Sequence, residues 1–210
     1  MSYEIIALDN GPLKLEFTKP IMYKDGVLVE TESPAHLCRC GLSSNKPFCD
    51  GKHASVNFSS KREISKEIIQ NYKGKDISII FNRSICAGAG ECVRNLKTVF
   101  KSGSSSNWIY PDNDKNENII KTINDCPSGA LSYTIHGKRS LENSSTVKVT
   151  IMKNGPYNIE AVSFEHAPIP TNFSTRKYSL CRCGYSKNKP YCDYSHGDKK
   201  WDDEKLEERL

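Results

Sequence analysis

The stretch that decides the fold is CRCGLSSNKPFCDGKH, residues 38–53, and it occurs a second time as CRCGYSKNKPYCDYSH, residues 181–196. Both copies have the spacing C-x-C-x8-C-x3-H, with no gap between them. Three thiolates and one imidazole at fixed spacing are a typical set of metal ligands. The two copies predict two metal centres, and their ligands are Cys38, Cys40, Cys49 and His53 in the first and Cys181, Cys183, Cys192 and His196 in the second.

The spacing within each copy suggests how the ligands meet. Cys38 and Cys40 are two residues apart, so in an extended chain their side chains point the same way and can clamp one metal atom. Cys49 and His53 are four residues apart, the spacing of one helix face. Asp50 can then cap a short helix or accept a backbone N–H. Spacing alone leaves open both a single zinc ion and a two-iron cluster.

Composition narrows the class of protein. The 210 residues are 37% hydrophobic and carry a formal charge of +5, without a basic stripe that is interleaved with aromatic residues. We therefore expect thin cores and no nucleic-acid partner. No run of about 18 apolar residues is present, so we expect no membrane span. The nine cysteines are an odd number, which argues against a closed disulfide framework, and free thiols imply a reducing compartment, so we expect a cytoplasmic protein.

The repeat extends beyond the ligands. Alternating apolar residues that are typical of short strands precede each motif, and Asn154-Gly155-Pro156 repeats the turn signal Asn10-Gly11-Pro12. Duplicated units with thin cores tend to stack about a pseudo-two-fold axis. We expect an α+β, β-rich fold in which two such units flank an inserted domain. The predicted parts are a first unit over 1–60, an insert over 61–142, a second unit over 143–198 and a C-terminal tail over 199–210.

The insert has a different pattern, β-α-α-β. It predicts a strand over 76–81, helices over 91–100 and 118–125, and a closing strand over 131–135, after a segment 61–72 that reads as a linker helix or an edge strand. Cysteines stand at both helix junctions, which suggests a compact ferredoxin-like domain.

The three cysteines of the insert, Cys86, Cys92 and Cys126, follow the pattern C-x5-C…C-P. Bacterial ferredoxins have a C-x2-C-x2-C loop and a distant C-P, but here Ala89 stands at the central cysteine position. Three thiolates suit a [3Fe–4S] cluster. A [4Fe–4S] cluster would need a fourth ligand other than cysteine, such as water or Glu91. The alternative is an empty domain with three buried cysteines.

The repeated motif resembles the signature of the CDGSH iron–sulfur family, the mitoNEET-like proteins. Both copies match it at the ligands, the serine, the proline and the aspartate, whereas Lys52 stands where serine is usual and Tyr194 where glycine is usual. The resemblance implies a [2Fe–2S] cluster at each motif and a pseudo-dimer within one chain, so we expect a monomer. Residues 62–137 resemble the divergent mono-cluster ferredoxin domain that is often found with CDGSH motifs, and the segments 108–111 and 126–131 carry this likeness.

These features predict a multi-cluster iron–sulfur protein that transfers single electrons to or from redox partner proteins. A neutral imidazole ligand raises the reduction potential of a cluster and can titrate. No nucleophile–base pair and no Gly-rich nucleotide loop stands out, so we expect no enzyme and no catalytic residue. Two alternatives remain: a carrier that passes clusters to apo-acceptor proteins or senses iron or redox state, and a zinc-stabilised interaction module.

Overall fold

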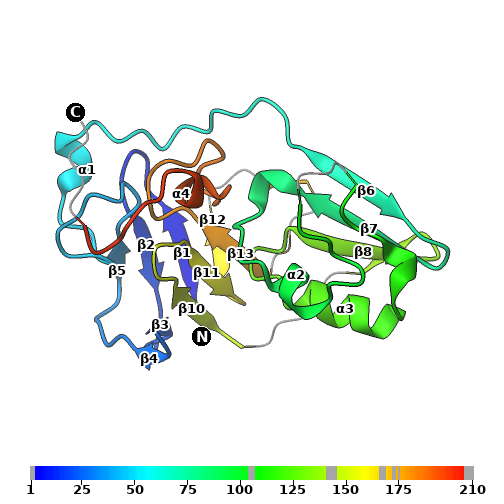
Figure 1. Cartoon of the computed structure of the whole chain (residues 1–210). Helices are drawn as coiled ribbons and strands as arrows, with labels where there is room; N and C mark the ends of the chain where they lie inside the picture. Colours follow the sequence, from blue (N-terminus) through cyan, green and yellow to red (C-terminus); the bar gives the residue numbers. More distant parts are fainter. Residues whose placement is uncertain are drawn as a thin grey trace.

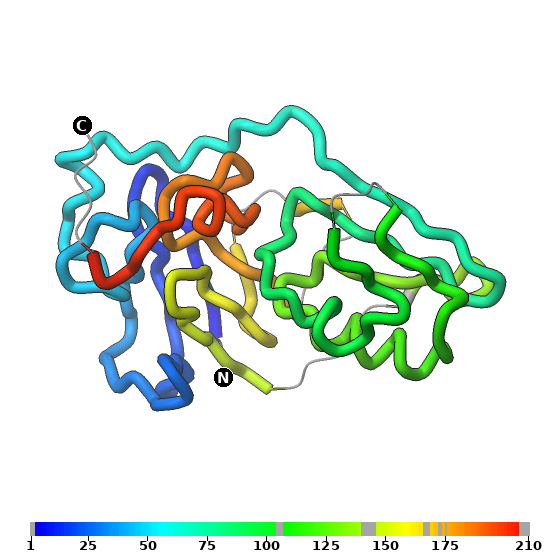
Figure 2. Tube along the Cα trace, in the orientation of Figure 1, coloured from blue at the N-terminus to red at the C-terminus, as the bar shows by residue number. Residues whose placement is uncertain are grey.

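The computed structural model describes residues 3–103, 107–140, 146–165, 169–171, 174 and 176–205. The chain forms a larger part that carries both repeated motifs and a smaller part that holds the insert (Figure 1). An extended segment after residue 58 runs across the molecule and joins the larger part to the insert, as the tube in Figure 2 shows. No helix in these ranges has the length and apolar character needed to cross a membrane.

The first sheet is built mainly from the first repeat. It contains β1 (Glu4–Ala7), β2 (Leu13–Glu16) and β5 (Ala35–Leu37), and it is completed by β12 (Ser163–Glu165) from the second repeat in the order β12-β1-β2-β5. Every second residue of β2 is buried, as its alternating sequence predicts. The strand β12 runs parallel to β1, and all other pairs in this sheet are antiparallel.

The second sheet repeats this arrangement with the roles of the repeats reversed. It contains β10 (Lys148–Ile151), β11 (Tyr157–Glu160) and β13 (Lys177–Leu180) from the second repeat, and β3 (Met22–Lys24) and β4 (Val27–Leu28) from the first. The strand β3 runs parallel to β10. Each sheet therefore depends on a strand from the other repeat, so the two repeats share their sheets.

The insert forms a third sheet with two helices beside it. Its order is β6-β7-β8-β9, and its elements are β6 (Ile69–Lys73), β7 (Ile77–Asn82), α2 (Glu91–Asn95), α3 (Asn116–Asn124), β8 (Leu131–Ile135) and β9 (Lys138–Ser140). Short 3-10 turns span Arg83–Ile85 and Pro111–Asn113.

The predicted pattern of the insert is confirmed with three changes. The strand that was expected to close the insert, β8, is followed by β9, which pairs with it and lies at the end of the sheet. The helix expected over 91–100 ends at Asn95, because Leu96 takes a non-helical φ of −144° and Phe100 then pairs with Ile109 in a β-bridge. Of the two interpretations of 61–72, the edge strand is the better one, since β6 lies at the end of its sheet and no helix forms there.

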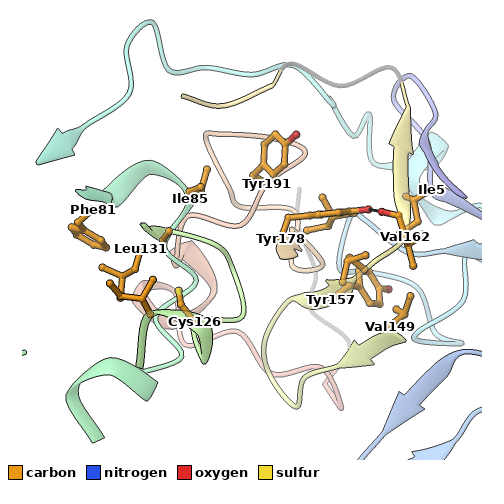
Figure 3. Packing of buried hydrophobic residues seen from close by; sticks show 14 of the residues in the cluster. Ile5, Phe81, Ile85, Cys126, Leu131, Val149, Tyr157, Val162, Tyr178 and Tyr191 are labelled. Atoms are coloured by element: carbon orange, nitrogen blue, oxygen red, sulfur yellow. Dashed lines mark hydrogen bonds between the residues drawn. The ribbon is translucent and has the colours of Figure 1, made fainter. Parts of the chain in front are cut away.

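One apolar core extends through both parts of the molecule. Phe81, Ile85 and Leu131 from the insert belong to the same buried cluster as Tyr157 and Tyr178 from the second repeat. Figure 3 shows these side chains on either side of Tyr191, which comes from the second motif. The insert is therefore packed against the second repeat and does not hang from a flexible linker.

Candidate metal centres

Each repeated motif brings its four predicted ligands together as two pairs. In the first motif, the Sγ atoms of Cys38 and Cys40 are 3.6 Å apart, and Cys49 Sγ lies 3.2 Å from His53 Nδ1. The second motif repeats both pairs: the Cys181 and Cys183 sulfurs are 3.7 Å apart, and Cys192 Sγ lies 3.4 Å from Nδ1 of its histidine, His196. All of these cysteines are free thiols.

The pair distances match those of ligands on one tetrahedral metal. Metal–sulfur and metal–nitrogen bonds of about 2.3 and 2.0–2.1 Å place two sulfurs about 3.8 Å apart, and a sulfur and a nitrogen about 3.5 Å apart. No group of three or more His, Cys, Asp or Glu side chains in the described ranges is arranged to hold one metal ion. Each motif thus presents two ligand pairs, one of two thiols and one of a thiol and an imidazole.

The prediction that the third cysteine and the histidine lie on one face of the same helix is wrong. The helix α1 (Lys52–Ser55) begins three residues after Cys49, and α4 (Ser195–Asp198) begins after Cys192 in the same way. A left-handed turn joins the cysteine to the helix, with φ of +87° at Gly51 and +78° at Tyr194. Tyrosine therefore adopts at the second site the backbone conformation that glycine adopts at the first.

The aspartate after the third cysteine closes each ligand loop. Asp50 accepts hydrogen bonds from the backbone N–H groups of Ser44 and Lys52, at 2.8 and 3.0 Å. Burial alone raises the pKa of Asp50, but these hydrogen bonds outweigh it and lower the pKa to about 2. Asp193 accepts from Lys187 and Ser195 in the same way. Of the two predicted roles, bonding to backbone N–H groups is therefore confirmed, while neither helix has a side-chain cap.

The protonation states of the ligands favour metal binding. The hydrogen bond from Cys40 lowers the pKa of Cys38 to about 6, and Cys183 lowers that of Cys181 to about 7. Each thiol pair therefore shares one proton and holds one thiolate near neutral pH. Burial lowers the pKa of His196, which keeps its imidazole neutral and able to bind a metal.

The middle cysteines line one small cavity. Cys86, Cys92 and Cys126 surround it together with Glu91 and Ser128, and the backbone of residues 88–92 forms one wall. Burial raises the pKa of Cys86, and it raises that of Cys92 to about 12, so these thiols stay protonated unless a metal binds. Three thiols that face one cavity are the donor set that an iron–sulfur cluster requires.

Sequence reasoning missed several residues that support these sites. Ser128 lies in the middle cavity with its Oγ 3.7 Å from Cys126 Sγ, and it is buried. The Tyr157 hydroxyl, from the second repeat, lies 3.0 Å from the carbonyl oxygens of both Cys38 and Pro47 in the first motif. The predicted tail over 199–210 contains two buried residues, Trp201 and Asp203, whereas 206–210 lie outside the described residues. Of these three features, only the contact between Ser128 and Cys126 joins residues that are close in the sequence, so only this contact could be predicted from the sequence.

Comparison with known proteins agrees with the geometry. The family model described as "Iron-binding zinc finger CDGSH type" matches residues 10–54 and 154–197, and the one described as "Divergent 4Fe-4S mono-cluster" matches residues 72–136. The "Uncharacterized protein YjdI" of Escherichia coli, strains K12 and O157:H7, is 40% identical over 62 residues, which are 30% of this chain and 80% of that protein. No solved structure matches.

The paired ligands, the cysteine-lined cavity and these matches define an iron–sulfur protein. The chain belongs to the CDGSH iron-binding family, and it carries two CDGSH units on either side of a divergent mono-cluster domain.

Proposed function

We propose that this protein holds a [2Fe–2S] cluster at each CDGSH motif and transfers single electrons between redox partner proteins. The observation that carries the proposal is the division of each ligand set into a Cys–Cys pair and a Cys–His pair. Such pairs suit two metal atoms that are joined by sulfide, with one pair on each. The His-ligated atom makes the reduction potential higher than in an all-cysteine site.

We propose that the two units form a pseudo-two-fold pair within a monomer. The exchange of β3 and β12 between the sheets supports this arrangement, because four strands of each sheet are equivalent and follow an equivalent order, and β4 is an additional strand of the second sheet. We propose unit boundaries at residues 60, 142 and 198. The two CDGSH units on either side of the insert share strands between their sheets. No catalytic residue is assigned, and a cytoplasmic location remains part of the proposal.

At the middle site we propose a [3Fe–4S] cluster on Cys86, Cys92 and Cys126. A [4Fe–4S] cluster is the alternative, with a fourth ligand from Glu91, Ser128 or water. Glu91 forms an ion pair with Arg94 at 2.5 Å, whereas Ser128 is buried beside Cys126. These contacts favour Ser128 over Glu91 as a side-chain ligand in the four-iron alternative.

Iron and acid-labile sulfide per chain test the proposal on protein purified without oxygen. We expect about 7 iron and about 8 sulfide, falling to about 4 of each in Cys126→Ala. About 4 of each in the wild-type protein would mean that the middle site is empty. Zinc in place of iron would contradict the redox function and favour the zinc-stabilised module.

Cluster transfer to apo-acceptor proteins is the second candidate, and the position of His53 favours it. This histidine lines an open surface cavity of about 430 Å³ with Asn57 and Phe58. A ligand that solvent can reach can be protonated and released. We would mix the loaded protein with an apo-ferredoxin and compare the wild type with His53→Cys. Equal transfer by both would contradict a carrier that depends on this histidine.

A further inference from the structure

The ligand loop of the second CDGSH site is bonded directly to the loop of the middle site. Arg83 Nη1 donates a hydrogen bond to the carbonyl oxygen of Asp193 at 3.2 Å, and Asn188 Nδ2 donates to the carbonyl oxygen of Ser84 at 2.7 Å. Asp193 directly follows the ligand Cys192, and Ser84 comes two residues before Cys86. These bonds fix the position of one ligand set relative to the other.

The Tyr194 ring fills the space between the two sites. A Cβ atom on Gly88 would lie 2.0 Å from Tyr194 Cδ2, so the ring packs directly on the backbone two residues after Cys86. The same ring meets the ligand His196 edge to face, with centroids 5.4 Å apart and an interplanar angle of 74°. One side chain therefore contacts the histidine of one site and the cysteine loop of the other.

The first CDGSH site has no counterpart to this contact. Gly51 stands at the equivalent position, and a Cβ atom there would meet no other atom within 4 Å. Tyrosine at φ +78° carries a steric cost, between its Cβ and the backbone, that glycine avoids. A residue keeps such a conformation where its surroundings hold it. The contacts with Gly88 and His196 are those surroundings.

The middle site is also open to small molecules on the side of Tyr194. A cavity of about 400 Å³ lies there, and Cys86, Arg83, Trp108 and Tyr194 are among the residues that line it. Three of these residues belong to the insert and the fourth to the second motif. An external one-electron donor can therefore reach the Cys86 loop beside the contact with the second site.

Building on the function proposed above, we propose that Tyr194 is a positioning residue that couples the middle site to the second CDGSH site for electron exchange. One electron leaves the group held by Cys86, Cys92 and Cys126, which is oxidised, and enters the group at the second motif, which is reduced. No proton moves and no bond breaks. The exchange proposed here concerns the middle and second sites, because the first motif has glycine, Gly51, at the position of Tyr194 and His53 there lines an open surface cavity.

The test compares the full-length protein with Tyr194→Phe and Tyr194→Gly. Iron and sulfide are counted first, so that only fully loaded samples are compared. A photoexcited flavin then supplies one electron per chain, and visible absorption follows its redistribution between the sites. A rate that is independent of protein concentration identifies exchange within one chain.

We expect Tyr194→Phe to keep the wild-type rate, because it retains the ring. Tyr194→Gly is expected to slow the exchange severalfold, because it removes the ring that packs on Gly88 and on His196. Fully loaded Tyr194→Gly protein that exchanges at the wild-type rate would overturn the role of Tyr194 but leave the proposed function intact. Wild-type protein without iron would overturn both.

Discussion

The Nη2 atom of Arg182 lies 2.5 Å from the Oδ2 atom of Asp203, and the two side chains are only 1% and 3% exposed. Arg182 stands between the first two ligands of the second motif, and its Nε atom also donates to the Gly155 carbonyl at 2.9 Å. The matching Arg39 of the first motif donates to Gly11 in the same way, but no ion pair with a carboxylate is found for it among the described residues. The C-terminal segment therefore supplies a buried carboxylate to the arginine of the second motif, whereas its contact with the first motif is the hydrogen bond from Lys46 to the Lys205 carbonyl.

We predict that Asp203→Asn lowers the free energy of unfolding by about 3–5 kcal/mol, because it leaves a buried guanidinium without its counter-charge. Denaturant unfolding measures this loss. Asp202→Asn is the control: the Asp202 side chain is 30% exposed, and its ion pair with Lys205 spans 3.5 Å, so we expect a loss below about 1 kcal/mol. Equal losses in the two variants would contradict the importance of the buried pair.

The same pair predicts how this stability changes with pH. Burial alone raises the pKa of Asp203, but the hydrogen bond and charge of Arg182 outweigh it and lower the pKa below its ordinary value. A lowered pKa in the folded state means that the stabilisation is present above the unfolded value, near 3.9, and is lost as the pH falls below it. The difference between wild type and Asp203→Asn is therefore expected to shrink in acid and to be constant from pH 6 to pH 8.

A hydroxyl from the second repeat supports the first site, which gives a second prediction. Tyr157→Phe leaves the Cys38 carbonyl without this donor, and we expect a loss of about 1–3 kcal/mol. We also expect a chelator to remove iron from the first site faster. Tyr178→Phe is the matched control, because its hydroxyl donates to the Val162 carbonyl at 2.9 Å, away from every motif (Figure 3). If both variants lose stability but release iron equally, the hydroxyl of Tyr157 does not support the site.

Acid is expected to release the metal at the histidine-ligated sites. Burial lowers the pKa of His196 below its ordinary value near 6.5, so the imidazole stays neutral at pH 7 and a proton competes with the metal only as the pH falls below that value. We expect the visible absorption to decay faster at pH 5 than at pH 8. Asp50 of the first motif, with its pKa of about 2, stays ionised throughout this range and keeps its hydrogen bonds to the ligand loop.

The double variant His53→Cys, His196→Cys checks this assignment. Replacing both imidazoles by thiolates removes the histidine contribution to acid release, so the difference between the decay rates at pH 5 and pH 8 should shrink. The thiols of Cys38 and Cys181, with pKa values of about 6 and about 7, are common to both proteins. Decay that still accelerates in acid to the wild-type extent would assign the lability to groups other than the two histidines.

Local patterns in the sequence predict the ligand sets, which stay a prediction, and each repeated motif brings its predicted residues together as pairs. The alternating residues of β2 and the apolar face of α3 likewise indicated their elements correctly. These features depend on neighbours that are at most five residues away, where the period of a strand or helix fixes the geometry.

Contacts between distant segments could not be predicted in this way. The exchange of β3 and β12 joins residues that are more than 120 positions apart, and neither strand differs in composition from an ordinary edge strand. The sequence pattern assigns Trp201 and Asp203 to the C-terminal tail, because their burial depends on a partner, Arg182, that only the folded chain brings near. Tyr194 looked like a simple departure from the motif for the same reason.

The close approach of the two motifs gives a last prediction. Gly41 has a φ of +78°, and a Cβ atom on it would lie 2.4 Å from the carbonyl oxygen of Cys183 in the other motif. Gly51 has a similar φ of +87° but open space around it. Alanine at either position costs about 1–2 kcal/mol for the left-handed backbone, and only at Gly41 does a backbone clash add to that cost.

We therefore expect Gly41→Ala to lower the free energy of unfolding by at least about 1–3 kcal/mol more than Gly51→Ala, the usual cost of overpacking. Denaturant unfolding of the two variants isolates the clash, since the backbone conformation is common to both. Because the clash lies between the repeats, Gly41→Ala should also reduce the iron retained at both motifs, while Gly51→Ala should affect the first motif alone. Similar losses of stability in the two variants would show that the motifs do not pack backbone to backbone in solution.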